Sequence, residues 1–156
     1  ISSVGNIRAS GIVTASSYLA SQGNNKYDAE NAHDYSYKNA WVEGVPGYGI
    51  GEYLVYKFHK STPPINTIII VNGYVKNNSS WQKNSRVKKL KVYLNDKEFV
   101  YLNLQDNISE QHFYVPEIDN FNNGFEIKFE IMEVYKGTKY DDVVISEIYF
   151  DGGGCH

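Results

Sequence analysis

The sequence of 156 residues predicts an all-β fold, an antiparallel β-sandwich, and three observations support this. Apolar and polar residues alternate without a fault in 125–131, and this period of two is typical of a half-buried strand. Clusters of Gly, Asn, Ser and Pro separate this stretch from others of the same kind. Helical periodicity is nearly absent. About seven strands at such spacing favour a sandwich or a barrel.

The expected strands lie in the last two thirds of the chain. They cover 53–58, 68–71, 90–94, 100–104, 125–131 and 143–150. Residues 68–71 are apolar on both faces, which predicts a central strand. Val87 has the opposite parity from Leu90, Val92 and Leu94, which predicts a bulge or a later strand start. The run Asn95-Asp96-Lys97 predicts a tight hairpin turn.

The first third of the chain has a different pattern. Strand signals are poor over 16–46, and a short helical turn is expected near 28–34. Long ordered loops in compact domains are usually functional, so we expect this segment to contribute to a site.

Length and charge restrict the class of protein. The length fits a single domain over 1–156, and the net charge of −3 argues against a nucleic-acid binder. The single cysteine, Cys155, excludes an internal disulfide, and no stretch approaches the length of a transmembrane segment. Because the chain begins at Ile1, we expect a mature or excised form. The composition favours a secreted or cell-surface bacterial protein.

Several short motifs occur in an order that resembles a known family. They are Ala15-Ser16-Ser17, Asn31-Ala32-His33-Asp34, Asn39-Ala40-Trp41, Arg86 to Val92, and Ser146-Glu147-Ile148. Together they resemble discoidin domains, which include the F5/8 type C domains and family 32 carbohydrate-binding modules. This resemblance implies a jelly-roll fold of the galactose-binding-like type.

The resemblance covers residues 9–151, and a bacterial subgroup is more similar still. The segments 41–44, 49–52 and 72–74 resemble the NADase-type glycan-binding domains. Two positions depart from the family pattern: Tyr35 stands where the family has Gly, and Asn39 stands where it has Thr. Since Gly usually marks a backbone with positive φ, the turn at Tyr35 is expected to differ locally.

The resemblance also implies a structural calcium ion between the Asp34 loop and the last expected strand. Calcium binds six to eight hard oxygens, roughly, including backbone carbonyls. Asp34 and Glu147 would supply charge, Asn39 an amide oxygen, and Ala32 and Tyr37 carbonyl oxygens. The alternative is that Asp34 caps a turn and Glu147 pairs with a Lys.

Two later loops are candidates for ligand binding. Segment 73–86 contains Tyr74, Trp81, Asn84 and Arg86, and segment 132–142 contains Tyr135 and Tyr140. Sugar recognition needs an aromatic face flanked by amide, carboxylate or guanidinium groups.

The two tryptophans have different expected roles. Trp81 lies in a polar setting, so we predict that it is the stacking platform, whereas Trp41 is expected in the core. Arg86 either contacts ligand or pairs with Glu43 or Glu52 to brace the scaffold.

Catalytic constellations are not apparent in the sequence. The histidines His33, His59, His112 and His156 are scattered, and no nucleophile elbow occurs. We therefore expect a non-catalytic module. The resemblance and the aromatic loops imply that it binds a glycan or glycoconjugate, and the resemblance implies a catalytic or toxin domain beside it in a longer protein. Two alternatives stay open, namely a protein- or phospholipid-binding adhesin and a small hydrolase.

Overall fold

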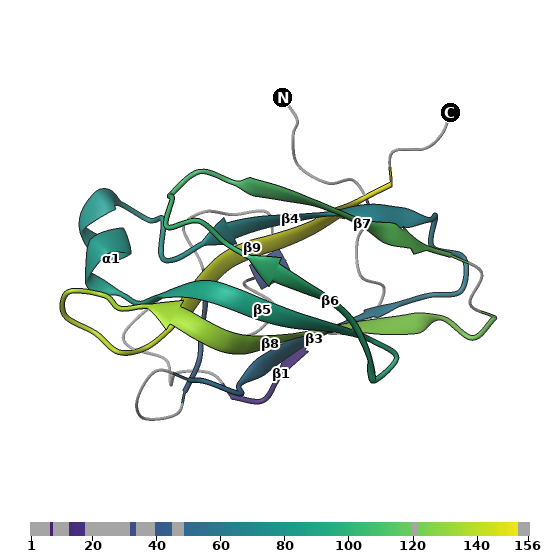
Figure 1. Ribbon diagram of the computed structural model, residues 1–156, viewed down its shortest axis with the longest axis horizontal. Helices are drawn as coiled ribbons and strands as arrows, with labels where there is room; N and C mark the ends of the chain where they lie inside the picture. Colours follow the sequence, from purple (N-terminus) through teal and green to yellow (C-terminus); the bar gives the residue numbers. More distant parts are fainter. Residues whose placement is uncertain are drawn as a thin grey trace.

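The computed structural model describes residues 7, 13–17, 32–33, 40–44, 49–119 and 122–152. Within these residues, two antiparallel sheets pack face to face, and their strands run along the long axis of the molecule (Figure 1). The predicted antiparallel β-sandwich is confirmed. Among the described residues, no helix has the length and apolar character needed to cross a membrane.

The first sheet has five strands, in the order β1-β3-β8-β5-β6. Their bounds are β1 Thr14–Ala15, β3 Tyr53–Phe58, β5 Arg86–Leu94, β6 Lys97–Asn103 and β8 Phe125–Tyr135. Along β8, the residues Phe125, Ile127, Phe129 and Ile131 are buried, as the alternation predicts. However, β8 continues to Tyr135, so the loop expected from residue 132 begins at Lys136.

Two local predictions in β5 are confirmed. The register between β5 and β8 shifts on both sides of Lys89, which is the irregularity that the parity of Val87 predicts. Asn95 and Asp96 join β5 to β6 with φ of 51° and 67°. Positive φ at both central residues is the signature of a type I′ hairpin turn, whose twist matches the strands.

The second sheet has four strands, in the order β2-β9-β4-β7. Their bounds are β2 Trp41–Val42, β4 Ile65–Asn72, β7 Gln111–Ile118 and β9 Val144–Asp151. β4 lies between β9 and β7, and its residues 68–71 are buried on both faces, so the predicted central strand is confirmed. The strand β7 was not among those expected. It lies at the sheet edge, contains Pro116 and exposes 84% of Tyr114, so its apolar pattern is weak.

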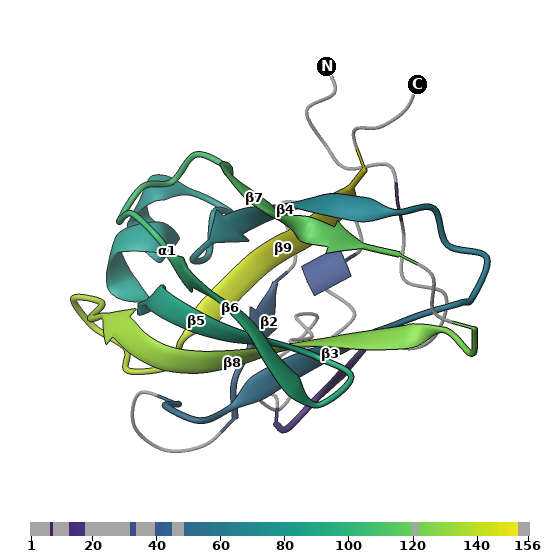
Figure 2. The same ribbon diagram turned by 45° about the vertical axis from the view of Figure 1, so that its right-hand side comes forward.

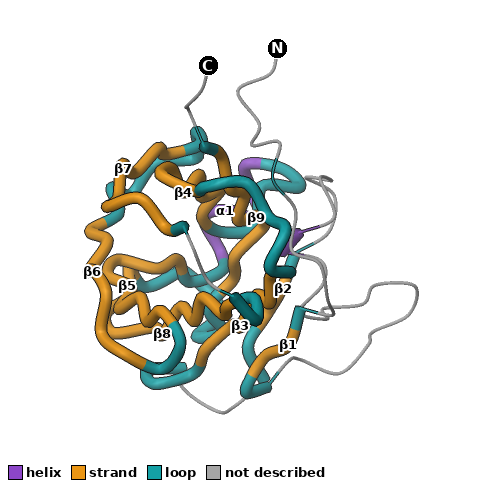
Figure 3. Tube along the Cα trace, turned by 90° about the vertical axis from the view of Figure 1, so that its right-hand side faces the viewer, coloured by secondary structure: helices purple, strands orange, loops and turns teal. Residues whose placement is uncertain are grey.

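The core between the sheets is rich in aromatic rings. Phe150 of β9 contacts Tyr56 and Phe58 of β3 edge-on, at centroid distances of 5.2 and 4.9 Å. His33 also packs edge-on against Tyr56, at 5.3 Å. Trp41 is fully buried, as expected, and its indole N–H donates to the Ser17 carbonyl at 2.8 Å. Figures 2 and 3 show the two layers from other sides.

A buried amide connects the two layers near one end of the sandwich. Asn72, the last residue of β4, donates from Nδ2 to the Val87 carbonyl at 2.7 Å and accepts at Oδ1 from the Val87 N–H at 2.9 Å. Val87 belongs to β5 in the other sheet. The Asn72 side chain therefore makes the same two hydrogen bonds with Val87 that the backbone of a neighbouring strand would make. In this way the buried N–H and C=O of Val87 both have partners.

Replacing this amide should destabilise the whole domain. Asn72→Ala leaves the buried N–H and C=O of Val87 without partners, and we expect a loss of about 2–4 kcal/mol in the free energy of unfolding. Urea denaturation of the two proteins measures this loss. Asn103→Ala, at an exposed position of β6, is the matched control and should change stability little. Equal stability of the Asn72 variant and the parent would contradict the role of the amide.

Candidate functional site

The loops at one end of the sandwich contain most of the candidate residues. The β4–β5 connection, expected as a loop, contains the short helix α1, Asn78–Lys83 (Figure 1). Asn77 caps its first turn by accepting from the Ser80 N–H at 2.8 Å, and Asn84 closes its end by donating from Nδ2 to the Ser80 carbonyl at 2.9 Å. The helix has six residues and none is buried, so no apolar period marks it in the sequence.

Trp81 of α1 rests on the end of β4. Its indole N–H donates to the Asn72 carbonyl at 3.0 Å. The ring also packs on Gly73, where an added Cβ would lie 2.7 Å from Cδ1 and from Nε1. Gly73 has φ of +84°, a conformation that side chains disfavour. The ring is half-buried, so Trp81 contributes to the packing of this end. Its role in ligand binding stays a prediction.

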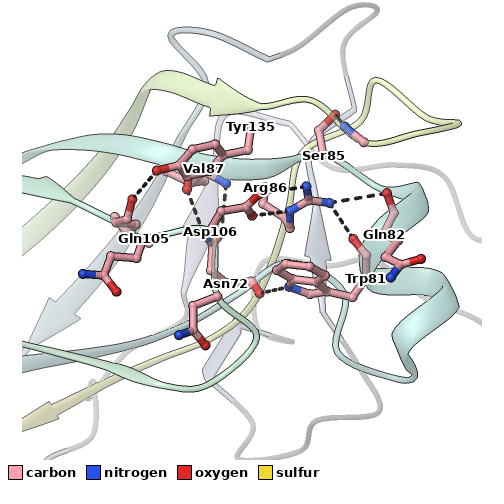
Figure 4. A network of polar contacts seen from close by, with 12 residues as sticks. Asn72, Trp81, Gln82, Ser85, Arg86, Val87, Gln105, Asp106 and Tyr135 are labelled. Carbon is pink, nitrogen blue, oxygen red and sulfur yellow. Dashed lines mark hydrogen bonds and ion pairs between the residues drawn. The ribbon is translucent and has the colours of Figure 1, made fainter.

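Arg86 is buried and connects three segments at this end. Its Nε lies 2.7 Å from Oδ1 of Asp106, and its Nη1 donates to the carbonyls of Trp81 and Asn84 at 2.7 and 2.9 Å (Figure 4). Its Cζ lies 4.3 Å from the centre of the Trp81 ring. The prediction of Glu43 or Glu52 as its partner is wrong, because the β6–β7 loop brings Asp106 to the guanidinium. Such charge-assisted and cation–π contacts brace α1 against β5.

Several residues of the loop between β8 and β9 form hydrogen bonds with the end of α1. The Tyr140 N–H donates to the Lys83 carbonyl at 2.8 Å, and the Thr138 N–H donates to the Gln82 carbonyl at 2.9 Å. The Ser85 hydroxyl donates to the Tyr140 carbonyl at 3.0 Å. The two loops predicted to bind ligand are therefore side by side.

The six predicted ligand residues all lie toward this end, but they differ in exposure. Tyr140 is 43% exposed and is the most accessible aromatic ring of the set. Tyr74 packs on Val42 and Val144, and the Tyr135 hydroxyl donates to the Leu104 carbonyl at 2.8 Å. Their ligand roles stay predictions, as do those of Trp81, Asn84 and Arg86.

Two residues that organise this end had no clear signal in the sequence. Asn72 follows the apolar run 68–71 and belongs to the family-like segment 72–74, but neither pattern predicts its role, and Asp106 lies in a polar loop like several others. Only their contacts with Val87 and Arg86 distinguish them.

A pair of carboxyl groups joins the β2–β3 and β8–β9 connections. Glu43 is fully buried and accepts from the Val143 N–H at 3.1 Å. Burial raises the pKa of the neighbouring Asp142, Asp141 raises it further, and a hydrogen bond with Glu43 lowers it. A direct hydrogen bond between two carboxyl groups requires that one of them holds a proton.

The residues predicted to bind calcium are described only in part. Asp34, Tyr37 and Asn39 lie outside the described residues. Ala32 and Glu147 are fully buried, and the Ala32 carbonyl accepts from the Tyr56 hydroxyl at 3.0 Å. His33 Nδ1 lies 2.9 Å from the Ile148 carbonyl, which brings 32–33 next to β9 beside Glu147. The described part of the chain has no group of three His, Cys, Asp or Glu side chains placed to hold a metal.

These layers define a galactose-binding-like β-sandwich, the class of the F5/8 type C domains. The family model for the NAD glycohydrolase translocation F5/8 type C domain matches residues 7–151. The chain therefore belongs to this family. Translocation domains of this kind and carbohydrate-binding modules are non-catalytic modules.

Solved structures with the same fold include carbohydrate-binding modules. The Clostridium perfringens module CpGH89CBM32-5, in complex with GalNAc-β-1,3-galactose, is 15% identical with a TM-score of 0.67, over 90% of this chain and 94% of that one. The family 32 module of C. perfringens NanJ, in complex with galactose, is 14% identical with a TM-score of 0.61, over 89% of this chain and 91% of that one.

A third similar structure is the Streptococcus pyogenes NAD+-glycohydrolase translocation domain. It is 30% identical with a TM-score of 0.49, over 72% of this chain and 96% of that one. No curated protein matches the chain.

The Asp142 carboxyl should make stability depend on pH. The pKa of Asp142 is raised in the folded state. Its contribution to the free energy of unfolding is therefore fully present below the unfolded pKa of about 3.9, and this stability is lost as the pH rises through the folded pKa. Asp142→Asn keeps a hydrogen-bond partner for Glu43, because the amide oxygen still accepts, and removes the charge. We expect the variant to gain stability relative to the parent as the pH rises, measured by urea unfolding from about pH 4 to 7. Asp96→Asn, in the turn between β5 and β6 at the end of the sandwich away from α1, is the control and should not show this pH dependence. A difference in stability that is the same at every pH would contradict this assignment.

Proposed function

We propose that this chain is a non-catalytic glycan-binding module of a secreted or cell-surface bacterial protein. Its family and fold support the proposal, and two proteins with the same fold were solved with galactose-containing ligands. The observation that carries it is the braced loop end, where Tyr140 is exposed beside α1. Aromatic faces with neighbouring amides and carboxylates are the groups that bind sugar rings and their hydroxyls.

The contacts of Trp81 restrict how a sugar would bind. The Arg86 guanidinium lies over one face of the indole ring, so a sugar would have to stack on the opposite face. The ring is held by its bond to Asn72 and by the packing on Gly73, which limits its motion. A site that is rigid before binding loses little conformational entropy when the ligand binds. Tyr140 and Asn84 are the neighbouring groups that would complete the site.

The family suggests how glycan binding would be used. We infer that the longer protein carries a catalytic or toxin domain of the NAD glycohydrolase kind, and that this module holds it at a glycan-bearing cell surface for translocation. The family assignment supports this inference, since the matching model describes a domain of NAD glycohydrolase translocation.

One observation favours the second candidate, a protein- or phospholipid-binding module. Ile50 and Ile108 are 56% and 38% exposed, in the β2–β3 and β6–β7 loops at the α1 end. Exposed apolar residues at loop tips are the groups that insert into membranes or contact proteins. Tyr140 and the polar side chains around it favour the glycan.

We also propose a structural calcium ion between the Asp34 loop and β9. Asp34, Asn39 and Glu147 would bind it with side-chain oxygens, and Ala32 and Tyr37 with carbonyl oxygens. The proposal is supported by the buried carboxyl of Glu147 in β9 and by the contact of His33 with the neighbouring Ile148, because calcium prefers hard oxygens and the 32–33 segment lies beside β9. The ion would supply positive charge that holds the loop against the sheet.

A glycan array tests the binding function. The parent should bind galactose-containing glycans, and Tyr140→Ala and Trp81→Ala should each weaken binding about tenfold or more, because an aromatic face is lost. Circular dichroism checks that each variant is folded. Tyr114→Ala removes an exposed ring on the edge strand β7 and should leave binding unchanged. A silent array together with liposome binding that Ile50→Ser abolishes would instead support the second candidate.

Thermal melts with and without a chelator test the calcium ion. At a calcium concentration of roughly 100 times Kd the ion stabilises by about 2.7 kcal/mol, so EDTA should lower Tm by about 5–10 °C and added calcium should restore it. Glu147→Gln should remove most of this sensitivity to the chelator. An unchanged Tm of the parent in EDTA would contradict the proposal.

A further inference from the structure

A polar hollow lies at the opposite end of the sandwich from α1. Its volume is about 390 Å³, and it is lined by the end of β3, the β5–β6 turn and the start of β8. Figure 2 shows the turn between β5 and β6 at the other end of the layers from α1. None of the six predicted ligand residues belongs to it.

The walls of the hollow are fixed by contacts between strands. Asn95 Oδ1 accepts from the Glu126 N–H at 2.9 Å, and the Asn95 N–H donates to the Glu126 carbonyl at 3.0 Å. These bonds hold the β5–β6 turn against the first residues of β8. Gly124 has φ of +80°, and an added Cβ would lie 2.4 Å from the Phe58 carbonyl oxygen. The backbone at Gly124 is therefore packed closely against the end of β3.

The hollow has a polar rim, and two phenylalanines belong to its lining. Phe58 and Phe125 also line the hollow, but they are only 4% and 7% exposed, and their rings stack on each other at a centroid distance of 4.9 Å with an angle of 11° between their planes. The rim has the ammonium of Lys57, the carboxylates of Asp96 and Glu126, and the amide of Asn123. The side chains of Asp96 and Asn123 form no hydrogen bond with any described residue, so their polar atoms are available.

The charges on the rim select the class of ligand. Two carboxylates oppose one ammonium, so the rim does not match an anion such as phosphate. Lys57 Nζ lies 3.8 Å from Glu126 Oε2, which leaves a single carboxylate for a cation, and calcium needs several. A neutral polyol fits, because each hydroxyl both donates and accepts and the rim offers both kinds of partner. The volume lies within the usual range for small-ligand pockets, roughly 300–1,000 Å³.

We propose that this hollow is a second carbohydrate site, which binds one sugar ring through the side chains of Asp96 and Asn123 on the rim. The site does not depend on what the α1 end binds. A module with one site at each end of its layers would bind two glycan branches at once, which increases avidity when the branches match that spacing.

Titration followed by ¹⁵N–¹H NMR spectra tests the site with four probes, namely galactose, N-acetylgalactosamine, glucose and mannose. With at least one sugar, the amide signals of Asp96, Asn123 and Gly124 should shift and saturate. Asp96→Ala and Asn123→Ala should each weaken this binding about three- to tenfold, the effect of one lost hydrogen bond. Lys97→Ala, on the same hairpin but outside the hollow, should not.

The two ends of the molecule give separate outcomes. Tyr140→Ala should leave the titration of Asp96, Asn123 and Gly124 unchanged. Shifts confined to the α1 end would overturn the second site and still support glycan binding by the first. The second site is also overturned if none of the four sugars shifts the three signals, or if the double variant Asp96→Ala with Asn123→Ala titrates like the parent.

Discussion

The buried amide of Asn72 is the contact on which the α1 end of the molecule depends. By pairing with the Val87 peptide at 2.7 and 2.9 Å, it joins the sheets where β4 leaves one and β5 enters the other. The Asn72 carbonyl then accepts from the Trp81 indole, which seats α1 on the end of β4. A buried peptide group without a partner costs free energy, so this pairing lets the chain cross between layers inside the core.

Arg86 extends that connection to the surrounding loops. One guanidinium contacts the Asp106 carboxylate, the carbonyls at the end of α1 and the face of Trp81. The β8–β9 loop adds backbone bonds to the same helix end. The candidate binding surface is thus built on buried polar contacts, and its exposed groups are presented by segments that have little freedom to move. Such preorganisation suits recognition of a sugar, whose few hydroxyl contacts must be placed accurately.

The two ends of the sandwich have different chemistry. At the α1 end, Tyr140 and the isoleucines Ile50 and Ile108 are exposed around a braced helix, which suits contact with a surface or a large glycan. At the opposite end, a polar rim surrounds a small hollow. The strands between the two ends pack the core. The loops at each end lie on the surface, so their sequences can differ without destabilising the sheets.

The sequence by itself determined most of the long strands, because alternation along a strand reports which face is buried. It predicted the sandwich, the bulge near Val87, the turn at Asn95 and the burial of Trp41, all from residues adjacent in the chain. The edge strand β7, the helix α1 and the partner of Arg86 were decided only by the tertiary structure. An edge strand needs only one buried face, and α1 buries none of its residues, so neither leaves a strong apolar pattern. Arg86 meets Asp106 because two loops converge in space, and no local pattern encodes that convergence.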